Sequence, residues 1–234
     1  MLTTPSVLPA QPAPPVRRVS FRPPIGPGRL IAFEGVDGAG KSTSIALAGE
    51  ILGAAGVPFE QIDLLSPECR RLPYFRLHAD DPVGTSAGSG DQPSLGIVCL
   101  ADRLAHLRTR YHEVVRRGTW LLVDRYVYTP LAEGVALGSD PDDLRALTSL
   151  AGMFPRPDAA FFPLAPADLV IERIRSRPKD RHKVLDPAFY RKALNAFAAY
   201  SEHGWTALDS TRGTDAVRDE LRAVIDPLMS SARV

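Results

Sequence analysis

A glycine-rich segment, Leu30–Thr43, constrains the fold of this chain more than any other stretch. Its sequence, LIAFEGVDGAGKST, fits the phosphate-binding pattern G-x-x-x-x-G-K-[ST] without a gap, directly after an apolar run. Glycines let the backbone turn its N–H groups inward around anionic oxygens, and the following helix points its positive dipole end at the same anion. The pattern predicts a triphosphate site, although a glycine-rich turn between strand and helix is the plain alternative.

The residue types in this loop suggest a role for each position. Lys41 would reach the β- and γ-phosphates, and the Ser42 hydroxyl would lie on Mg²⁺, which makes Mg²⁺ with ATP the expected cofactor. The residues expected at the triphosphate are Gly35, Val36, Asp37, Gly38, Ala39, Gly40, Lys41, Ser42 and Thr43.

Length and charge narrow the class of protein. The 234 residues suit one α/β domain with a substantial core. A formal net charge of +1 gives no reason to expect nucleic acid or an anionic membrane as partner. No stretch approaches the ~20 apolar residues of a membrane span, and no signal-peptide core precedes a cleavage site. The two cysteines, Cys69 and Cys99, form no motif and favour reduced thiols in a cytoplasmic protein.

The N-terminal stretch differs from the rest of the chain. Residues Met1–Gly28 carry eight prolines and little hydrophobic periodicity, which favours extended, solvated backbone. We expect residues 1–28 to be a disordered extension and residues 29–234 to form the folded domain. A role as a proline-rich ligand is the alternative.

Short apolar runs alternate with helical patterns along the folded domain. The expected strands cover 30–33, 57–64, 120–123, 159–162 and 205–208, and the expected helices cover 40–55, 96–117, 141–152, 166–176, 186–203 and 214–229. Ser66–Leu95, rich in Pro, Gly, Ser and Asp, predicts a long loop with a helical turn at most. This alternation favours a parallel sheet with helices on both faces, whose ligand lies beyond the carboxyl ends of the strands. Asp37, Asp124 and Arg125 all follow strand ends, so we expect the site there.

Two charged pairs carry further candidate residues. Asp124 follows an apolar strand and can hold Mg²⁺ beside Ser42, while Arg125 offers a planar fork to a phosphate. A strand-end ion pair is the alternative for these two. Asp102–Arg103 lies on the long predicted helix, where Arg103 can aim at the phosphate of an acceptor or simply belong to an exposed charged face.

An arginine-rich run follows the fourth strand. Glu172–Lys183, ERIRSRPKDRHK, packs four arginines around Pro178. A mobile lid that brings positive charge to a transferring phosphoryl group would have this composition, and so would a solvated basic face. The break at Pro178 favours the lid.

Taken in order, FEGVDGAGKST, LADRLAHL, VDRY, FPRPD and ERIRSRPKDRHK resemble thymidylate kinases over roughly Arg29–Asp209. The resemblance implies a three-layer P-loop NTPase fold with five parallel strands, a short lid, and ATP-dependent phosphorylation of a nucleoside monophosphate. It implies that Arg103 and Arg125, with Tyr126, bind the acceptor, and that Asp37 contacts its sugar or Mg²⁺. Because Gly38 stands where some members have arginine, it implies a catalytic arginine from the lid, with Arg177 and Arg181 as the best fit.

Three places differ from the family pattern. Ser66–Arg71 replaces an Arg-Glu-Pro-Gly-Gly-like segment, Cys99 replaces an aromatic that stacks on thymine, and Pro130 and Glu133 stand where groups tend to face the base. We therefore expect thymidine monophosphate itself to be a poor acceptor.

The expected function is phosphorylation of thymidine monophosphate or a close analogue, with ATP and a nucleotide-like acceptor as partners. A kinase of the same fold that acts on another nucleotide, a nucleoside or a small metabolite is one rival, and a non-catalytic ATP-binding module is another. Nucleic acid and membrane are not expected as partners, and a homodimer is compatible with the sequence.

Overall fold

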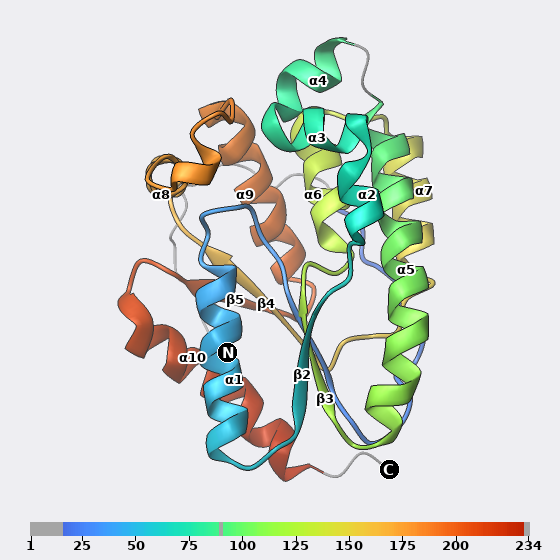
Figure 1. Cartoon of the computed structure of the whole chain (residues 1–234), viewed down its shortest axis with the longest axis vertical. Helices are drawn as coiled ribbons and strands as arrows, with labels where there is room; N and C mark the ends of the chain where they lie inside the picture. The colour runs from blue at the N-terminus through green and yellow to red at the C-terminus, as the bar shows by residue number, and fades with distance from the viewer. Residues whose placement is uncertain (1–15, 89–90, 232–234) are drawn as a thin grey trace.

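The computed structural model describes residues 16–88 and 91–231, and these form a five-stranded parallel sheet between helices (Figure 1). The strand order is β2-β3-β1-β4-β5, as expected for a parallel sheet built by crossovers on both faces. The strands are β1 Leu30–Phe33, β2 Phe59–Asp63, β3 Trp120–Asp124, β4 Ala159–Leu164 and β5 Thr206–Asp209.

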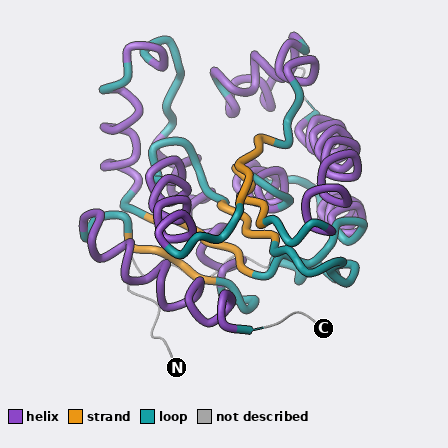
Figure 2. The backbone as a smooth tube through the Cα atoms, turned by 60° about the horizontal axis from the view of Figure 1, so that its bottom comes forward, coloured by secondary structure: helices purple, strands orange, loops and turns teal. Residues whose placement is uncertain are grey.

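Helices cover both faces of this sheet, which gives the three predicted layers (Figure 2). On one face, Ile45 and Ile51 of α1 and Leu221 of α10 pack on the sheet in one apolar cluster. On the other face, α5, α6, α7 and α9 contribute to a larger cluster around Tyr128 and Phe162. The helices are α1 Lys41–Ala54, α2 Pro67–Arg71, α3 Pro73–Asp80, α4 Pro82–Gly88, α5 Gln92–Arg116, α6 Tyr128–Leu137, α7 Pro141–Ala151, α8 Ala167–Arg175, α9 Pro187–Ser201 and α10 Gly213–Ser230, with a 3₁₀ turn η1 at Pro178–Asp180.

The segment 66–95 is not the long loop that its composition predicts. It contains three short helices, each with proline in its first turn, and the start of α5. Proline breaks a helix interior but suits its first position, where no N–H is needed. Asp91 caps α5 by accepting a hydrogen bond from the Ser94 N–H, so this helix begins four residues before the predicted start at Gly96.

No sequence signal predicts α6. It carries Pro130 at its third position and is capped at its C-terminus by Gly138, whose φ of 76° is left-handed. The first four N–H groups of a helix have no intrahelical partner, so Pro130 costs this helix no hydrogen bond.

The N-terminal segment, residues 16–28, packs on the domain, and the expectation of a disordered extension is wrong for these residues. Val19 is buried, and the ring of Phe21 packs against those of Tyr126 and Trp205. The Arg22 N–H donates to the Phe154 carbonyl at 2.9 Å, and Arg22 forms an isolated parallel bridge with Pro155. Residues 1–15 of the expected extension lie outside the described residues.

The strand register brings the candidate residues to one edge. Asp124, at the end of β3, lies opposite Phe33 of β1 and Asp63 of β2. The loop after β1 and the acids at the ends of β2 and β3 therefore meet, and α3, α4 and the segment after α8 lie at the same end of the molecule (Figure 1). Within the described ranges, none of the helices has the length and hydropathy needed to cross a membrane.

Candidate functional site

The loop Gly35–Ser42 has the backbone geometry that a phosphate cradle requires. Gly38 has φ of 80°, and a Cβ there would lie 2.7 Å from the Val170 carbonyl oxygen, so only glycine fits. Gly40, at φ 112°, begins α1 without a capping side chain. The N-terminal N–H groups of α1 consequently point into the loop, where they can bind an anion.

Lys41 is held across this loop. Its Nζ donates to the carbonyl oxygens of Gly35 and Val36, each at 2.9 Å, and the side chain is buried. Burial, together with the nearby Arg125 guanidinium, lowers the pKa of Lys41 to about 8. The ammonium group is thus fixed at the place where the pattern predicts contact with phosphates.

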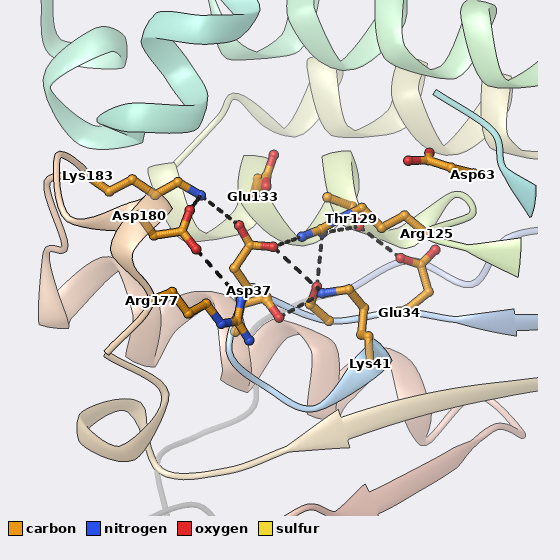
Figure 3. Close-up of polar contacts among 12 residues, drawn as sticks. Glu34, Asp37, Lys41, Asp63, Arg125, Thr129, Glu133, Arg177, Asp180 and Lys183 are labelled. Carbon is orange, nitrogen blue, oxygen red and sulfur yellow. Dashed lines mark hydrogen bonds and ion pairs between the residues drawn. The ribbon is translucent and has the colours of Figure 1, made fainter. Parts of the chain in front are cut away.

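Asp37 is the centre of a cluster of charges (Figure 3). Its Oδ1 lies 2.6 Å from Arg125 Nη2, its Oδ2 lies 3.0 Å from Lys183 Nζ, and Lys41 Nζ lies 3.9 Å away. The Arg125 charge, followed by those of Lys41 and Lys183, holds the pKa of Asp37 far below its usual value against the opposing effect of burial. Asp37 is therefore a carboxylate that joins the loop, β3 and the predicted lid.

Arg125 is held in an unusual backbone conformation. Its φ of 62° is the one positive value at a non-glycine residue in the described part of the chain. Its Nη1 donates to the Gly35 carbonyl oxygen at 3.0 Å and to Thr129 Oγ1 at 3.1 Å. Burial opposes its charge, but Asp37 and other acids outweigh this effect and raise the pKa of Arg125. The guanidinium is fixed between the loop and α6.

Glu34 stabilises this turn, and sequence reasoning missed it. The fully buried carboxylate accepts hydrogen bonds from the N–H groups of Tyr126 and Tyr128, at 2.9 and 2.7 Å, and from Thr129 Oγ1 at 2.9 Å. A buried carboxylate needs such donors. The sequence signal available was a charge placed directly after the wholly apolar strand Leu30–Phe33.

A cavity of about 370 Å³ lies beside the loop, and most of the residues predicted to bind the triphosphate line it. It is lined by Asp37, Gly38, Gly40, Lys41, Ser42, Thr43, Asp63, Arg70, Asp124, Arg125, Arg177, Lys179, Asp180 and Lys183. Asp124 Oδ1 is buried and has no hydrogen-bond partner among the described residues, and Ser42 lines the same space. A carboxylate and a hydroxyl oxygen at one edge fit a Mg²⁺ ion, which prefers oxygen ligands.

The segment after α8 covers this cavity. Arg177 lies 3.8 Å from the buried carboxylate of Asp180, which Lys183 also contacts at 3.2 Å. Arg173 instead donates to the carbonyl oxygens of Gly38 and Ser210, so it fixes the loop. Arg181 is exposed and is not among the described residues that line either cavity of the site.

A second cavity, of about 220 Å³, adjoins the first through Asp37, Arg70, Arg125 and Lys183, which line both. Its wall includes apolar side chains from α3 and α5, among them Phe75, Leu95 and Cys99. Arg103 lines it, donates to the Tyr126 carbonyl at 3.3 Å, and has a buried Nε without a partner among the described residues. This cavity can accept an anionic ligand that also carries an apolar part.

Tyr126 is not brought to either cavity. Its ring is fully buried, its hydroxyl donates to the Pro155 carbonyl at 2.8 Å, and it packs on Phe154 and Phe21. The expected contact of this side chain with the acceptor does not fit the structure. Its N–H, bound to Glu34, shows that Tyr126 supports the turn.

The fold and the paired cavities define a P-loop nucleoside monophosphate kinase. A family model described as thymidylate kinase matches residues 83–221, more than half of the chain. The chain belongs to the thymidylate kinase family.

Individual relatives agree over most of their length. The thymidylate kinase of Synechococcus sp. (strain CC9902) is 29% identical over 210 residues, which cover 85% of this chain and 97% of that protein. The thymidylate kinase of Akkermansia muciniphila is 29% identical over 198 residues, covering 85% and 91%. That of Chromohalobacter salexigens is 27% identical over 212 residues, covering 88% and 98%.

Proposed function

We propose that this chain transfers the γ-phosphoryl group of Mg-ATP to the phosphate of thymidine monophosphate or a close analogue. The observation that carries the proposal is the junction of the two cavities at Asp37, Arg125 and Lys183, beside the buried ammonium of Lys41. A donor and an acceptor phosphate entering from opposite cavities would meet there. A protein that only binds ATP needs no second cavity with arginines.

The roles follow from position and charge. The loop N–H groups and Lys41 bind the triphosphate, while Arg125 and Arg103 bind the acceptor phosphate. Phosphoryl transfer needs positioning and charge stabilisation rather than covalent chemistry, and fixed cations supply both. Ser42 and Asp124 would hold Mg²⁺, which when bound neutralises phosphate charge.

From the lid segment, Arg177 and Lys183 line the donor cavity, so we assign them the positive charge at the transferring group. Lys183 is an addition to the arginines predicted from the sequence. Arg181 remains a predicted lid residue that would need a closing movement to reach the phosphates.

The test is formation of ADP from ATP with a panel of nucleoside monophosphates and nucleosides, in the presence of Mg²⁺. Saturable turnover that requires both a monophosphate and Mg²⁺ supports the proposal. Turnover only with nucleosides or small alcohols would favour the rival kinase, and ATP binding without any acceptor-dependent ADP would favour a non-catalytic module. A cytoplasmic location and a homodimer stay predictions; fractionation of cells and gel filtration at several concentrations test them.

A further inference from the structure

The segment after α8 is attached to α3 on both sides of Lys183. His182 Nε2 lies 2.9 Å from Asp80 Oδ1, and the Val184 N–H donates to the Asp80 carbonyl oxygen at 2.8 Å. Asp80 is the last residue of α3, and its side chain is 48% exposed. A single residue of α3 therefore holds both chain neighbours of Lys183, one through its side chain and one through its backbone.

This attachment places Lys183 at the junction of the two cavities. Lys183 Nζ contacts Asp37 Oδ2 at 3.0 Å and Asp180 Oδ1 at 3.2 Å, and the side chain lines both cavities (Figure 3). Burial opposes its charge, but the two carboxylates outweigh this effect and raise the pKa of Lys183. A long side chain loses much rotamer freedom in such a position, so a backbone that is held on both sides favours these contacts.

The helix that carries this attachment is also a wall of the acceptor cavity. Phe75, His78 and Ala79 of α3 line that cavity. His78 is buried, and its Nε2 lies 3.3 Å from Oε2 of Glu133 on α6. Because Asp80 directly follows these residues, the same short helix faces the acceptor and holds the cation that reaches the donor cavity.

The contact of Asp80 with His182 is exposed, which limits what it can do. Exposed pairs of this kind contribute little to the stability of a whole domain, and they change a local equilibrium by about fivefold at most. The equilibrium in question is the detachment of one surface segment from α3, which opens far more readily than the core unfolds. Loss of the contact is therefore expected to change the position of the segment and not the fold.

We propose that Asp80 is a positioning residue that holds the lid segment, residues 177–184, on α3 and thereby keeps Lys183 at the junction of the cavities. When the segment detaches, Lys183 leaves the transferring group, while the phosphate loop and Lys41 still bind ATP. The inference rests on the proposed function, because that function gives Lys183 its part in phosphoryl transfer.

The first test is steady-state kinetics with Mg-ATP and the most active nucleoside monophosphate of the panel. Asp80→Ala and His182→Ala should each lower kcat about two- to fivefold with a smaller change in the KM for ATP. Asp80→Asn, which keeps an acceptor oxygen, should lower kcat less. Glu113→Ala is the matched control and should equal the wild type, because Glu113 is 49% exposed and pairs with Arg117 far from the site.

A double variant tests whether Asp80 acts through Lys183. In the Lys183→Ala background, Asp80→Ala should lower kcat no further, because the side chain that it positions is already gone. A merely structural role of Asp80 would lower kcat by the same factor in both backgrounds.

The second test follows the segment itself and needs no turnover. Trypsin cleaves after lysine and arginine, and the segment offers Lys179, Arg181 and Lys183. Cleavage of a folded protein follows the population in which the segment is open. Asp80→Ala leaves the cleaved sequence unchanged, so cleavage there should be about two- to fivefold faster than in the wild type and Glu113→Ala, with the products identified by mass spectrometry.

Circular dichroism shows whether each variant folds, and His182→Ala replaces Asp80→Ala in the kinetics if the latter does not. The proposal is overturned if folded Asp80→Ala matches Glu113→Ala in either kcat or tryptic cleavage. Equal losses of kcat in the wild-type and Lys183→Ala backgrounds overturn it as well. Absence of acceptor-dependent ADP formation in the wild type would count against the proposed function, whereas the cleavage rates would still decide whether Asp80 holds the segment.

Discussion

Val19→Ala measures how much the N-terminal segment contributes to stability. Val19 is 6% exposed and belongs to the larger apolar cluster, so the substitution removes two buried methyl groups without changing the backbone. At about 0.8 kcal/mol for each buried group the two methyl groups account for roughly 1.6 kcal/mol, and a smaller contribution from the cavity left behind brings the loss to about 2 kcal/mol. For a domain of this size 1 kcal/mol shifts Tm by roughly 2–4 °C, so we expect a decrease of about 4–8 °C.

The assay is thermal unfolding followed by circular dichroism on the full chain. Val184→Ala is the control, because it makes the same chemical change at a side chain that is 54% exposed, and it should shift Tm by less than about 2 °C. Phe21→Ala should destabilise in the same direction as Val19→Ala, since its ring packs among Tyr126, Tyr128 and Trp205. If Val19→Ala unfolds at the same temperature as Val184→Ala, the segment does not pack in solution as described.

Three further predictions concern the charges of the site. Lys41→Ala should lower kcat by about 100-fold or more with an unchanged circular dichroism spectrum, and near-normal turnover at saturating ATP would refute the role of Lys41. Because the pKa of Lys41 is lowered to about 8, its positive charge is lost as pH rises through that value, well below the range of an ordinary lysine. The kcat/KM for Mg-ATP should therefore fall above about pH 8, and a profile that stays flat to about pH 9.5 would contradict this. Lys183→Ala should lower kcat about tenfold or more with a smaller effect on the KM for ATP, while Lys192→Ala, on the exposed side of α9, should match the wild type; equal kcat in both variants would exclude Lys183 from transfer.

The order of strands and helices could be predicted because its signals are local. The helix over 141–151 has Asp140 as its cap, and the helix over 187–201 has Asp186, as the sequence indicated. The short helices of segment 66–95 could not be predicted, because proline is common both at a helix start and in a loop. The packing of buried residues such as Cys69 and Leu95 decides between the two. The packing of residues 16–28 could not be predicted either, because the prolines there favour extended backbone. The few apolar side chains of this segment show no periodicity, and they are buried by elements distant in sequence.

The candidate site was predictable where a residue follows the end of a strand. The loop glycines, Lys41 and Arg125 follow strand ends, and parallel topology brings strand ends together. The hydrogen bond of Glu34 to Thr129 and the pairing of His78 with Glu133 join residues far apart in sequence, so no spacing rule identifies them. Tyr126 was misplaced for a related reason: its side chain points into the core, and it supports the site through its backbone, whose N–H donates to Glu34 and whose carbonyl accepts from Arg103.

The pairing of charges at the site explains how so many cations can be held in place there. Lys41 donates to two carbonyl oxygens, Lys183 contacts Asp37 and Asp180, and Arg177 lies 3.8 Å from Asp180. Each cation thus already contacts an oxygen atom of the chain and is held in position at little further cost in side-chain entropy. Phosphate oxygens at the junction of the cavities would meet the largely desolvated ammonium groups of Lys41 and Lys183, which are oriented in advance. Such preorganised charge is what accelerates phosphoryl transfer, because it requires no rearrangement as the transition state forms.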